Sequence, residues 1–369
     1  MNTLNRKILS IISFAFVAMG LILSNPLTTL EATATQATDD TSVETSAQTT
    51  TEKKNTEKKS NTVAITISGA GDCTLGVDSR YNNTFNDYYN RKGAAYFFKN
   101  VRSLFRKDDL TIVNFEGTLT NSSTRANKTY TFKGPAKYAK ILKKGSVEVV
   151  NLANNHTLDF GTTGFADTKK TLKDNGISYS GGSNIAYKKV QGVKIAFIGF
   201  NVLNGVSEQQ VKTTIAKAKK KKATIIIASF HWGIEKDYYP NAREKALGHC
   251  AISNGASLVL GHHPHRVQGI EKYKGRYIVY SLGNFCFGGH TNPDDKDAII
   301  FQQTFYVKNG KLQKKNDVKV VPCSISSVDY TNNFQPTILK GSEGKRLIRK
   351  INTLSKGMNA SFKYDGTAK

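Results

Sequence analysis

Short apolar runs alternate along the chain with longer amphipathic segments, a pattern typical of strands followed by helices. The apolar runs predict strands at Val63–Ser68, Leu110–Asn114, Glu148–Leu152, Lys194–Phe200, Thr224–Ser229, Ser257–Leu260 and Tyr277–Ser281. The amphipathic segments predict helices at Ala94–Phe105, Ala136–Lys143, Phe165–Asn175, Glu208–Lys221 and Ala242–Asn254. Repeated β-then-α units indicate an α/β protein with mostly parallel central strands.

Cap and turn residues support this division. Ser207, with Gln210 three residues later, predicts a capping box at a helix start. Gly176 and Gly255 stand where glycine commonly ends a helix. Near the C-terminus, two apolar runs flank Asn309-Gly310, the residue pair most typical of a two-residue β-hairpin turn.

The first 34 residues read as a targeting segment. Arg6 and Lys7 precede an uncharged apolar stretch from Ile8 to Ser24, and Ala32-Thr33-Ala34 supplies small residues suited to cleavage. The apolar stretch is at the short end for a membrane span, which favours a secretory signal over an uncleaved N-terminal membrane anchor. Both alternatives place the rest of the chain outside the cytoplasmic membrane.

Composition divides the remaining chain. Residues 35–62 are rich in Thr, Ser, Lys and Glu and have no aromatic side chain, so we expect a disordered linker. A folded domain is predicted over 63–335, and a basic helix and tail over 336–369. The four cysteines have no metal-type spacing and predict no disulfide framework.

The formal net charge of the 369 residues is +25, which predicts attraction to a polyanion. Anionic lipid, teichoic acid and other acidic polymers fit this charge. An extracytoplasmic address argues against nucleic acid as the partner.

Polar side chains of ligand type follow five of the predicted strands. In open α/β sheets, ligands bind in the crevice beyond the carboxyl ends of the strands. Five of the seven histidines fall in these segments, so together they predict a site. The residues concerned are Asp72, Asn114, Glu116, Asn154, Asn155, His156, Asp159, His231, His262, His263 and His265.

The segment GHHPH, residues 261–265, contains three of these histidines. Pro264 biases His263 toward extended backbone, in which residues two apart point the same way. We therefore expect His263 and His265 to face one metal centre and His262 to be a hydrogen-bonded structural ring. Carboxylates mixed with imidazoles, without thiolates, suit Mn, Fe or Zn better than a structural zinc site.

Six short blocks resemble the capsule-biosynthesis CapA family, which includes poly-γ-glutamate synthesis proteins of the PgsA type. Between Gly71 and Phe285 the chain carries, in that family's order, GDCTLG, NFEGTLT, NLANNHTLDFG, FHWGIE, GHHPHRVQGIE and YSLGNF. The family in turn resembles a branch of the calcineurin-like metallophosphoesterases. The resemblance implies a four-layer αββα sandwich with mixed, largely parallel sheets and a site for two divalent metal ions.

The resemblance also implies a role for each site residue. His156 matches the residue that contacts phosphate or protonates a leaving group, and Asp159 would orient it. Apart from the resemblance, Asn114 and Asn284 are candidate substrate contacts from their places at strand ends and turns, although a tight turn also explains Asn284. The implied metal ligands are Asp72, Glu116 as the bridging carboxylate, Asn155, His231, His263 and His265.

The chain departs from the phosphoesterase pattern at two positions. Thr74 stands where those enzymes carry a histidine, and Glu116 replaces an aspartate. Three functions therefore stay open: synthesis, export or attachment of a poly-γ-glutamate-like capsule, metal-dependent phosphoester hydrolysis, and polyanion binding without catalysis. The implied partners are an anionic polymer or phosphorylated substrate, and membrane-bound components of a polymer synthase.

Overall fold

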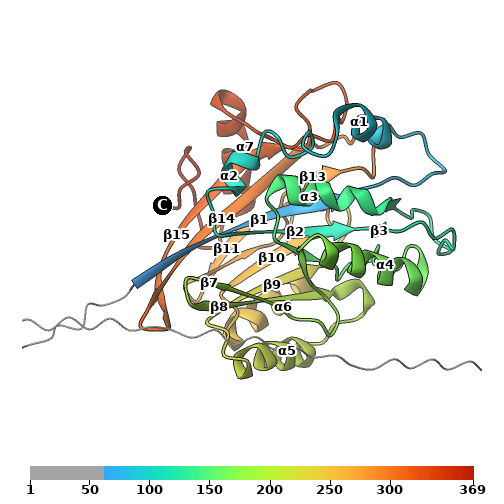
Figure 1. Ribbon diagram of the computed structural model, residues 1–369. Coiled ribbons are helices and arrows are strands. Elements are labelled where there is room, and N and C mark those ends of the chain that lie inside the picture. Colours follow the sequence, from blue (N-terminus) through green and yellow to red (C-terminus); the bar gives the residue numbers. More distant parts are fainter. Residues whose placement is uncertain (1–61) are drawn as a thin grey trace, which may run out of the picture. The chain divides into compact units, whose positions relative to one another are not determined.

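Two β-sheets pack face to face, and helices cover the outer face of each, in a computed structural model that describes residues 62–369 (Figure 1). Between the sheets lies one hydrophobic cluster, and a further cluster lies between each sheet and its helices. The predicted αββα sandwich with mixed, largely parallel sheets is confirmed.

The larger sheet has eight strands. β1 (Thr62–Thr74) pairs in parallel with β2 (Leu110–Glu116), which leads through parallel pairs to β5 (Val149–Asn151) and β6 (Ser178–Ser180). On the other side of β1 the pairing is antiparallel, and short β13 also joins β1 in parallel. These strands are β14 (Asp297–Lys308), β15 (Lys311–Ser324), β16 (Thr337–Ile338) and β13 (Asn284–Phe287).

The second sheet has six strands in the order β11-β12-β10-β9-β8-β7. Its four middle strands are parallel, and the outer strand at each edge is antiparallel. The strands are β7 (Ala186–Val190), β8 (Val193–Asn201), β9 (Ile225–His231), β10 (Leu258–His262), β11 (Ile270–Tyr273) and β12 (Arg276–Val279). A separate two-stranded piece joins β3 (Thr118–Leu119) to β4 (Lys133–Gly134).

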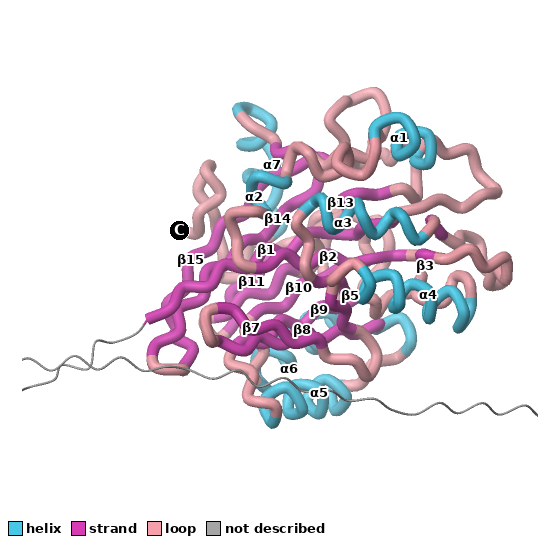
Figure 2. The backbone as a smooth tube through the Cα atoms, in the orientation of Figure 1, coloured by secondary structure: helices cyan, strands magenta, loops and turns pink. Residues whose placement is uncertain are grey.

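Helices of the outer layers are distributed by sheet, as the tube drawing shows (Figure 2). The larger sheet is covered by α1 (Phe85–Lys92), α2 (Arg102–Phe105), a 3₁₀ turn (Ala136–Tyr138), α3 (Ala139–Gly145) and α4 (Gly161–Asp174). The second sheet is covered by α5 (Glu208–Lys220) and α6 (Ala242–Asn254), and a 3₁₀ turn (Val202–Asn204) precedes α5. The C-terminal helix α7 (Gly341–Leu354) places Leu347, Ile348 and Ile351 in the cluster between the sheets.

All seven predicted strands are present, and the hairpin at Asn309-Gly310 joins β14 to β15. The capping box at the start of α5 forms as predicted, and Gly255 ends α6 with a positive φ of 112°. The helix predicted over Ala94–Phe105 is wrong, because residues 94–101 form turns and only Arg102–Phe105 is helical. Most of the large apolar residues of this segment are buried although the backbone forms successive turns. In the sequence, such residues look the same as the apolar face of a helix.

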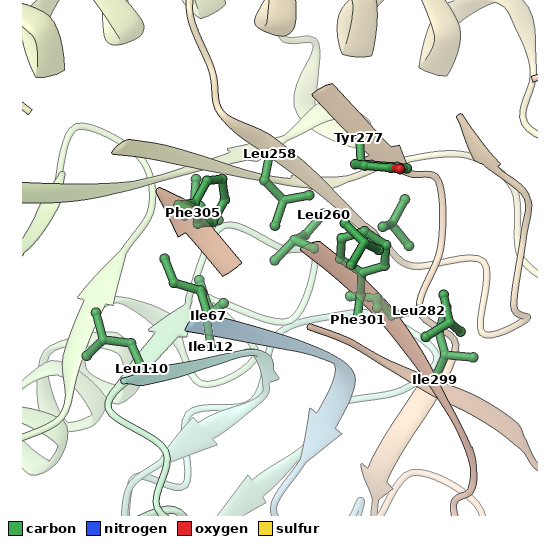
Figure 3. Packing of buried hydrophobic residues seen from close by; sticks show 14 of the residues in the cluster. Ile67, Leu110, Ile112, Leu258, Leu260, Tyr277, Leu282, Ile299, Phe301 and Phe305 are labelled. Carbon is green, nitrogen blue, oxygen red and sulfur yellow. The ribbon is translucent and has the colours of Figure 1, made fainter. Parts of the chain in front are cut away.

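Side chains from both sheets interdigitate in the central core (Figure 3). Ile67 and Ile112 of the larger sheet, together with Leu258 and Leu260 of the second, are buried there. Because strand side chains alternate between faces, the neighbouring Val113 and Val259 point instead to the helical layers. Each central strand is therefore apolar on both faces, which explains the continuous apolar runs.

Two glycines allow close backbone contacts where the site is built. A Cβ at Gly71 would lie 1.9 Å from the carbonyl oxygen of Gly283, and one at Gly261 would lie 1.8 Å from that of Tyr280. Gly71 immediately precedes Asp72, whose backbone N–H donates to the Gly283 carbonyl at 3.0 Å. A side chain at either glycine would push apart strands that present site residues.

The predicted targeting segment and nearly all of the predicted linker lie outside the described residues. Within residues 62–369, no helix has both the length and the apolar character that crossing a membrane requires. Cys73, Cys250, Cys286 and Cys323 are all buried free thiols.

Truncating a leucine between the sheets tests this packing. Leu260 is fully buried, so Leu260→Ala should lower the free energy of unfolding by about 2–5 kcal/mol. Leu203 is 43% exposed, and the matched change Leu203→Ala should cost less than about 0.5 kcal/mol. Urea unfolding of the full chain measures both values, and equal costs would contradict the core described here.

Candidate metal centre

Two carboxylates form the floor of the site. Asp72 on β1 and Glu116 on β2 are completely or almost completely buried, on neighbouring parallel strands. Asn114 donates one amide group to both of them, at 2.9 Å to Oδ1 of Asp72 and 3.2 Å to Oε1 of Glu116. The hydroxyl of Thr74 donates to Oε2 of Glu116 at 3.2 Å. Thr74 therefore holds a carboxylate at the position where phosphoesterases carry a histidine.

Hydrogen bonds from two further asparagines fix the side chain of Asn114. Its Oδ1 accepts from Nδ2 of Asn151 at 2.9 Å and from Nδ2 of Asn154 at 3.3 Å. Asn154 also donates to the Phe115 carbonyl at 2.7 Å. Because Asn114 is fully buried and its amide groups are engaged within the protein, its position favours orienting the carboxylates over contacting a substrate.

The end of β10 and the loop after it bring imidazoles from the second sheet to Asp72. Nδ1 of His262 lies 3.4 Å from Oδ1 of Asp72, and Nδ1 of His265 lies 3.4 Å from Oδ2. His265 also contacts Oδ1 of Asn284 at 2.8 Å, so Asn284 is placed to orient this ring. The ring centroids of His263 and His265 are 5.8 Å apart.

The extended conformation predicted for this loop is wrong. His263 has a φ of 97° and His265 a φ of 55°, and both values are positive. The backbone N–H of His263 donates to Oδ2 of Asp72 at 3.2 Å, and this tertiary contact accompanies the uncommon conformation. His262 is buried, but neither of its ring nitrogens has a hydrogen-bond partner among the described residues, so it is not the hydrogen-bonded ring we expected.

A second group faces the carboxylates from β9 and from the loop after β5. Nε2 of His231 lies 2.9 Å from Oδ1 of Asn155, and its Nδ1 lies 3.8 Å from Oε1 of Glu116. The ring of His263 is 4.7 Å from that of His231, centroid to centroid. Asn155 and His263, which follows β10, therefore both lie next to the His231 ring, while His265 lies close enough to Asp72 and Glu116 to share a cation with them.

His156 and Asp159 form a separate pair beside this cluster. Nδ1 of His156 lies 2.8 Å from Oδ2 of Asp159, and Oδ1 of Asp159 accepts from Nζ of Lys128 at 2.9 Å. Lys128 also donates to the Asn155 carbonyl at 2.9 Å. Phe132 packs against the His156 ring at 4.6 Å between centroids and donates its N–H to Asp159. Asp159 is thus fixed on three sides and orients His156.

Burial and mutual charge set the protonation of the cluster. Burial and the charge of Asp72 raise the pKa of Glu116 to about 8. Burial opposes ionisation of Asp72 too, yet the rings of His262 and His265 hold its pKa well below the ordinary value. Burial would lower the pKa of His265, but Asp72 and Glu116 raise it to about 9.

The remaining imidazoles favour the neutral form. Burial, with the charge of His265 as a second cause, lowers the pKa of His263 to about 4. Burial also lowers the pKa values of His231 and His156. Neutral imidazole is the form that binds metals, so these rings are chemically ready to act as ligands.

The donor set fits divalent cations. Asp72, Glu116 and His265 each offer a ligand atom, and these three atoms lie within 4.8 Å of one another. Glu235, His263 and His265 form a second such group near the surface. Nδ1 of His263 and Nε2 of His262 have no hydrogen-bond partner among residues 62–369, and buried orphan nitrogens are costly unless something binds them. Oxygen and imidazole ligands without thiolate suit Mn, Fe or Zn.

Lys128 and Glu235 were not predicted from the sequence as site residues. Lys128 lies in a polar loop with no motif of its own, and it reaches His156 across 28 positions of sequence. Glu235 lies within the block FHWGIE, four residues after His231, and an acidic residue so close to a predicted ligand is the signal that could have found it. Trp232, in the same block, is fully buried and packs in the cluster between the second sheet and its helices.

The fold and the site define an α/β sandwich protein with a carboxylate and imidazole cluster at the carboxyl ends of strands from both sheets. The family described as "Bacterial capsule synthesis protein PGA_cap" matches residues 66–289, more than half of the chain. The chain belongs to this family. The matched segment contains every residue of the predicted metal site.

Individual relatives agree with this assignment. The chain is similar to the PGA biosynthesis protein CapA of Bacillus subtilis (35% identity over 60% of this chain and 63% of that protein). It is also similar to the capsule biosynthesis protein CapA of Bacillus anthracis (30% identity, 64% of this chain and 63% of that protein). The chain therefore spans less than two thirds of the length of these relatives. Among solved structures, a hypothetical protein from Thermus thermophilus aligns with a TM-score of 0.44 and 13% identity, over 70% of this chain and 99% of that chain.

Cation binding should release protons and strengthen with pH. Glu116 and His265 hold protons at neutral pH, and a metal ligand must be deprotonated, so affinity should rise as the pH increases through about 8 to 9. Calorimetric titration of the full chain with Mn²⁺, in buffers of different ionisation enthalpy, measures this release. In Glu116→Gln the number of protons released should fall by about one. An affinity that does not change with pH would contradict the assignment.

Proposed function

We propose that this protein takes part, outside the cytoplasmic membrane, in the biosynthesis, export or attachment of a capsule polymer of the poly-γ-glutamate type, using a site for two divalent cations. The observation that carries the proposal is the carboxylate and imidazole cluster, which lies wholly within the segment that matches the capsule synthesis family. The names of the Bacillus relatives and the net charge of +25 support an acidic polymer as the partner.

Asp72, Glu116 and His265 would hold one cation, and Asn155, His231 and His263 would hold the other beside Glu116. Cations held there would supply Lewis-acid polarisation of a substrate carbonyl or phosphoryl oxygen. Asn114 and Thr74 keep the two carboxylates in place through hydrogen bonds. The carboxylates of Asp72 and Glu116 are therefore already held close together before any substrate binds.

His156 would move the proton that the reaction requires. Asp159 occupies Nδ1 of this ring, which leaves Nε2 as the atom that takes up or gives a proton. Lys128 neutralises Asp159, and its contact at 3.3 Å from Nδ1 of His156 adds to the effect of burial in keeping the ring neutral. A neutral ring near neutral pH suits a group that first accepts a proton and then returns it.

Complementation of a deletion strain tests the function. The strain should lack normal surface polymer, and the full chain should restore it. His156→Ala should restore less than about a tenth, because it removes the acid–base group, and Asp72→Ala should restore equally little, because it removes a cation ligand. Polymer released from washed cells and polymer in the medium are both measured, and immunoblotting shows whether each variant accumulates. Normal polymer in the deletion strain would overturn the proposal.

A cell-surface phosphoesterase is the second candidate, because His156 with Asp159 beside two carboxylates matches the needs of phosphoryl transfer. An assay of purified, Mn²⁺-loaded protein for hydrolysis of phosphomonoesters and phosphodiesters distinguishes the two candidate functions. Hydrolysis that is lost in His156→Ala favours the phosphoesterase. A cation-loaded protein that hydrolyses none of them while still supporting polymer formation favours the first proposal.

A further inference from the structure

A cavity of about 920 Å³ adjoins the metal centre on the side of α4 and α5. Its wall runs from Asn155 past the end of β8 to the exposed face of α5, and α4 lines the opposite side. The cavity spans the place where β6 at one edge of the larger sheet approaches β7 and β8 of the second sheet. Its volume is within the range of about 300–1,000 Å³ that ligand sites occupy.

The cavity is continuous with the predicted metal ligands. Asn155 lines it and also contacts Nε2 of His231 at 2.9 Å. Asn201, another lining residue, is the register partner of His231 in the β8–β9 pair. A chain lying in the cavity would therefore touch Asn155, whose side chain contacts the buried ring of His231.

The charge of the cavity has one sign. Lys169 on α4 and Lys217 on α5 both line it, and they stand on helices that cover different sheets (Figure 1). No aspartate or glutamate is among its described lining residues, and neither lysine forms a salt bridge within residues 62–369. Nζ of Lys169 lies 4.3 Å from the centroid of the Phe165 ring, which places its charge at the cavity wall. Two lysines on opposite walls suit a ligand that carries several carboxylates.

The rest of the lining is rich in carboxamides. Asn201, Asn204 and Gln209 join Asn155 there, and each offers both a donor and an acceptor. Asn204 and Gln209 are exposed to solvent, so a ligand in the cavity can reach their carboxamides. A carboxamide oxygen can accept from the N–H of an amide-linked chain, whereas a glycerol-phosphate chain has no N–H along its backbone.

We propose that this cavity binds an amide-linked chain bearing carboxylate groups and delivers it to the metal centre. The two lysines bind carboxylates, and the carboxamides pair with the amide links. This inference rests on the proposed function, since it names the location at which the polymer would be held. It adds a specific prediction, namely that binding depends on Lys169 and Lys217, which are not among the predicted cation ligands.

Binding of a fluorescently labelled γ-linked glutamate oligomer to the full chain tests the cavity. The pair Lys169→Gln/Lys217→Gln should raise Kd about tenfold, from the loss of two charge contacts. The matched pair Lys311→Gln/Lys314→Gln, in and beside the hairpin between β14 and β15, removes the same charge and should change Kd less than about twofold. Urea unfolding checks that all variants remain folded.

Asn204→Leu removes an exposed carboxamide from the cavity lining and so separates the amide contribution from charge. It should weaken binding of the glutamate oligomer several-fold and leave binding of a glycerol-phosphate oligomer unchanged. The cavity proposal is overturned if wild type does not bind the glutamate oligomer, or if the two lysine pairs behave alike. If the glutamate and glycerol-phosphate oligomers bind equally well, and the substitutions at Lys169 and Lys217 weaken both equally, the proposal that the ligand is amide-linked is overturned. None of these readouts measures polymer formation in cells, so the cavity can fail while the proposed function stands.

Discussion

The burial of two carboxylates side by side is the constraint on which the site depends. Asp72 and Glu116 lie at adjacent strand ends without access to water, where an unpaired charge is very costly. The hydrogen bonds from Asn114 and Thr74 offset part of this cost, and the raised pKa of Glu116 shows that burial and repulsion still disfavour its ionised form. Bound cations would offset the repulsion between the two carboxylates, and the surrounding imidazoles are placed to coordinate the same cations.

The αββα architecture creates this site by dividing the ligands between sheets. The carboxylates come from the larger sheet, and His231 and the histidines after β10 come from the second. The distance between the two sets is therefore determined by the core between the sheets, where Ile67 and Leu260 pack (Figure 3). Stability and site geometry are coupled for this reason, and glycine at positions 71 and 261 permits the close backbone approach that both require.

Much of the fold follows from sequence pattern, because strands buried on both faces form continuous apolar runs. The helix α1 does not show this pattern, since Phe85 is its one fully buried residue, Tyr88 and Tyr89 are half-buried, and the rest is polar. The sequence also identifies the site residues at the strand ends, but it does not predict the contacts that these residues make with one another. The positive φ values of His263 and His265 accompany tertiary contacts to Asp72 and Asn284 that no local pattern records. Lys128 likewise reaches His156 only in the folded chain.

The presence of cations at the carboxylate pair is the central claim, and anomalous diffraction from crystals grown with Mn²⁺ tests it most directly. The account predicts two anomalous peaks, one contacted by Asp72, Glu116 and His265, and one contacted by Asn155, His231 and His263. Crystals with Mn²⁺ in the solution but no peak at Asp72 and Glu116 would contradict it.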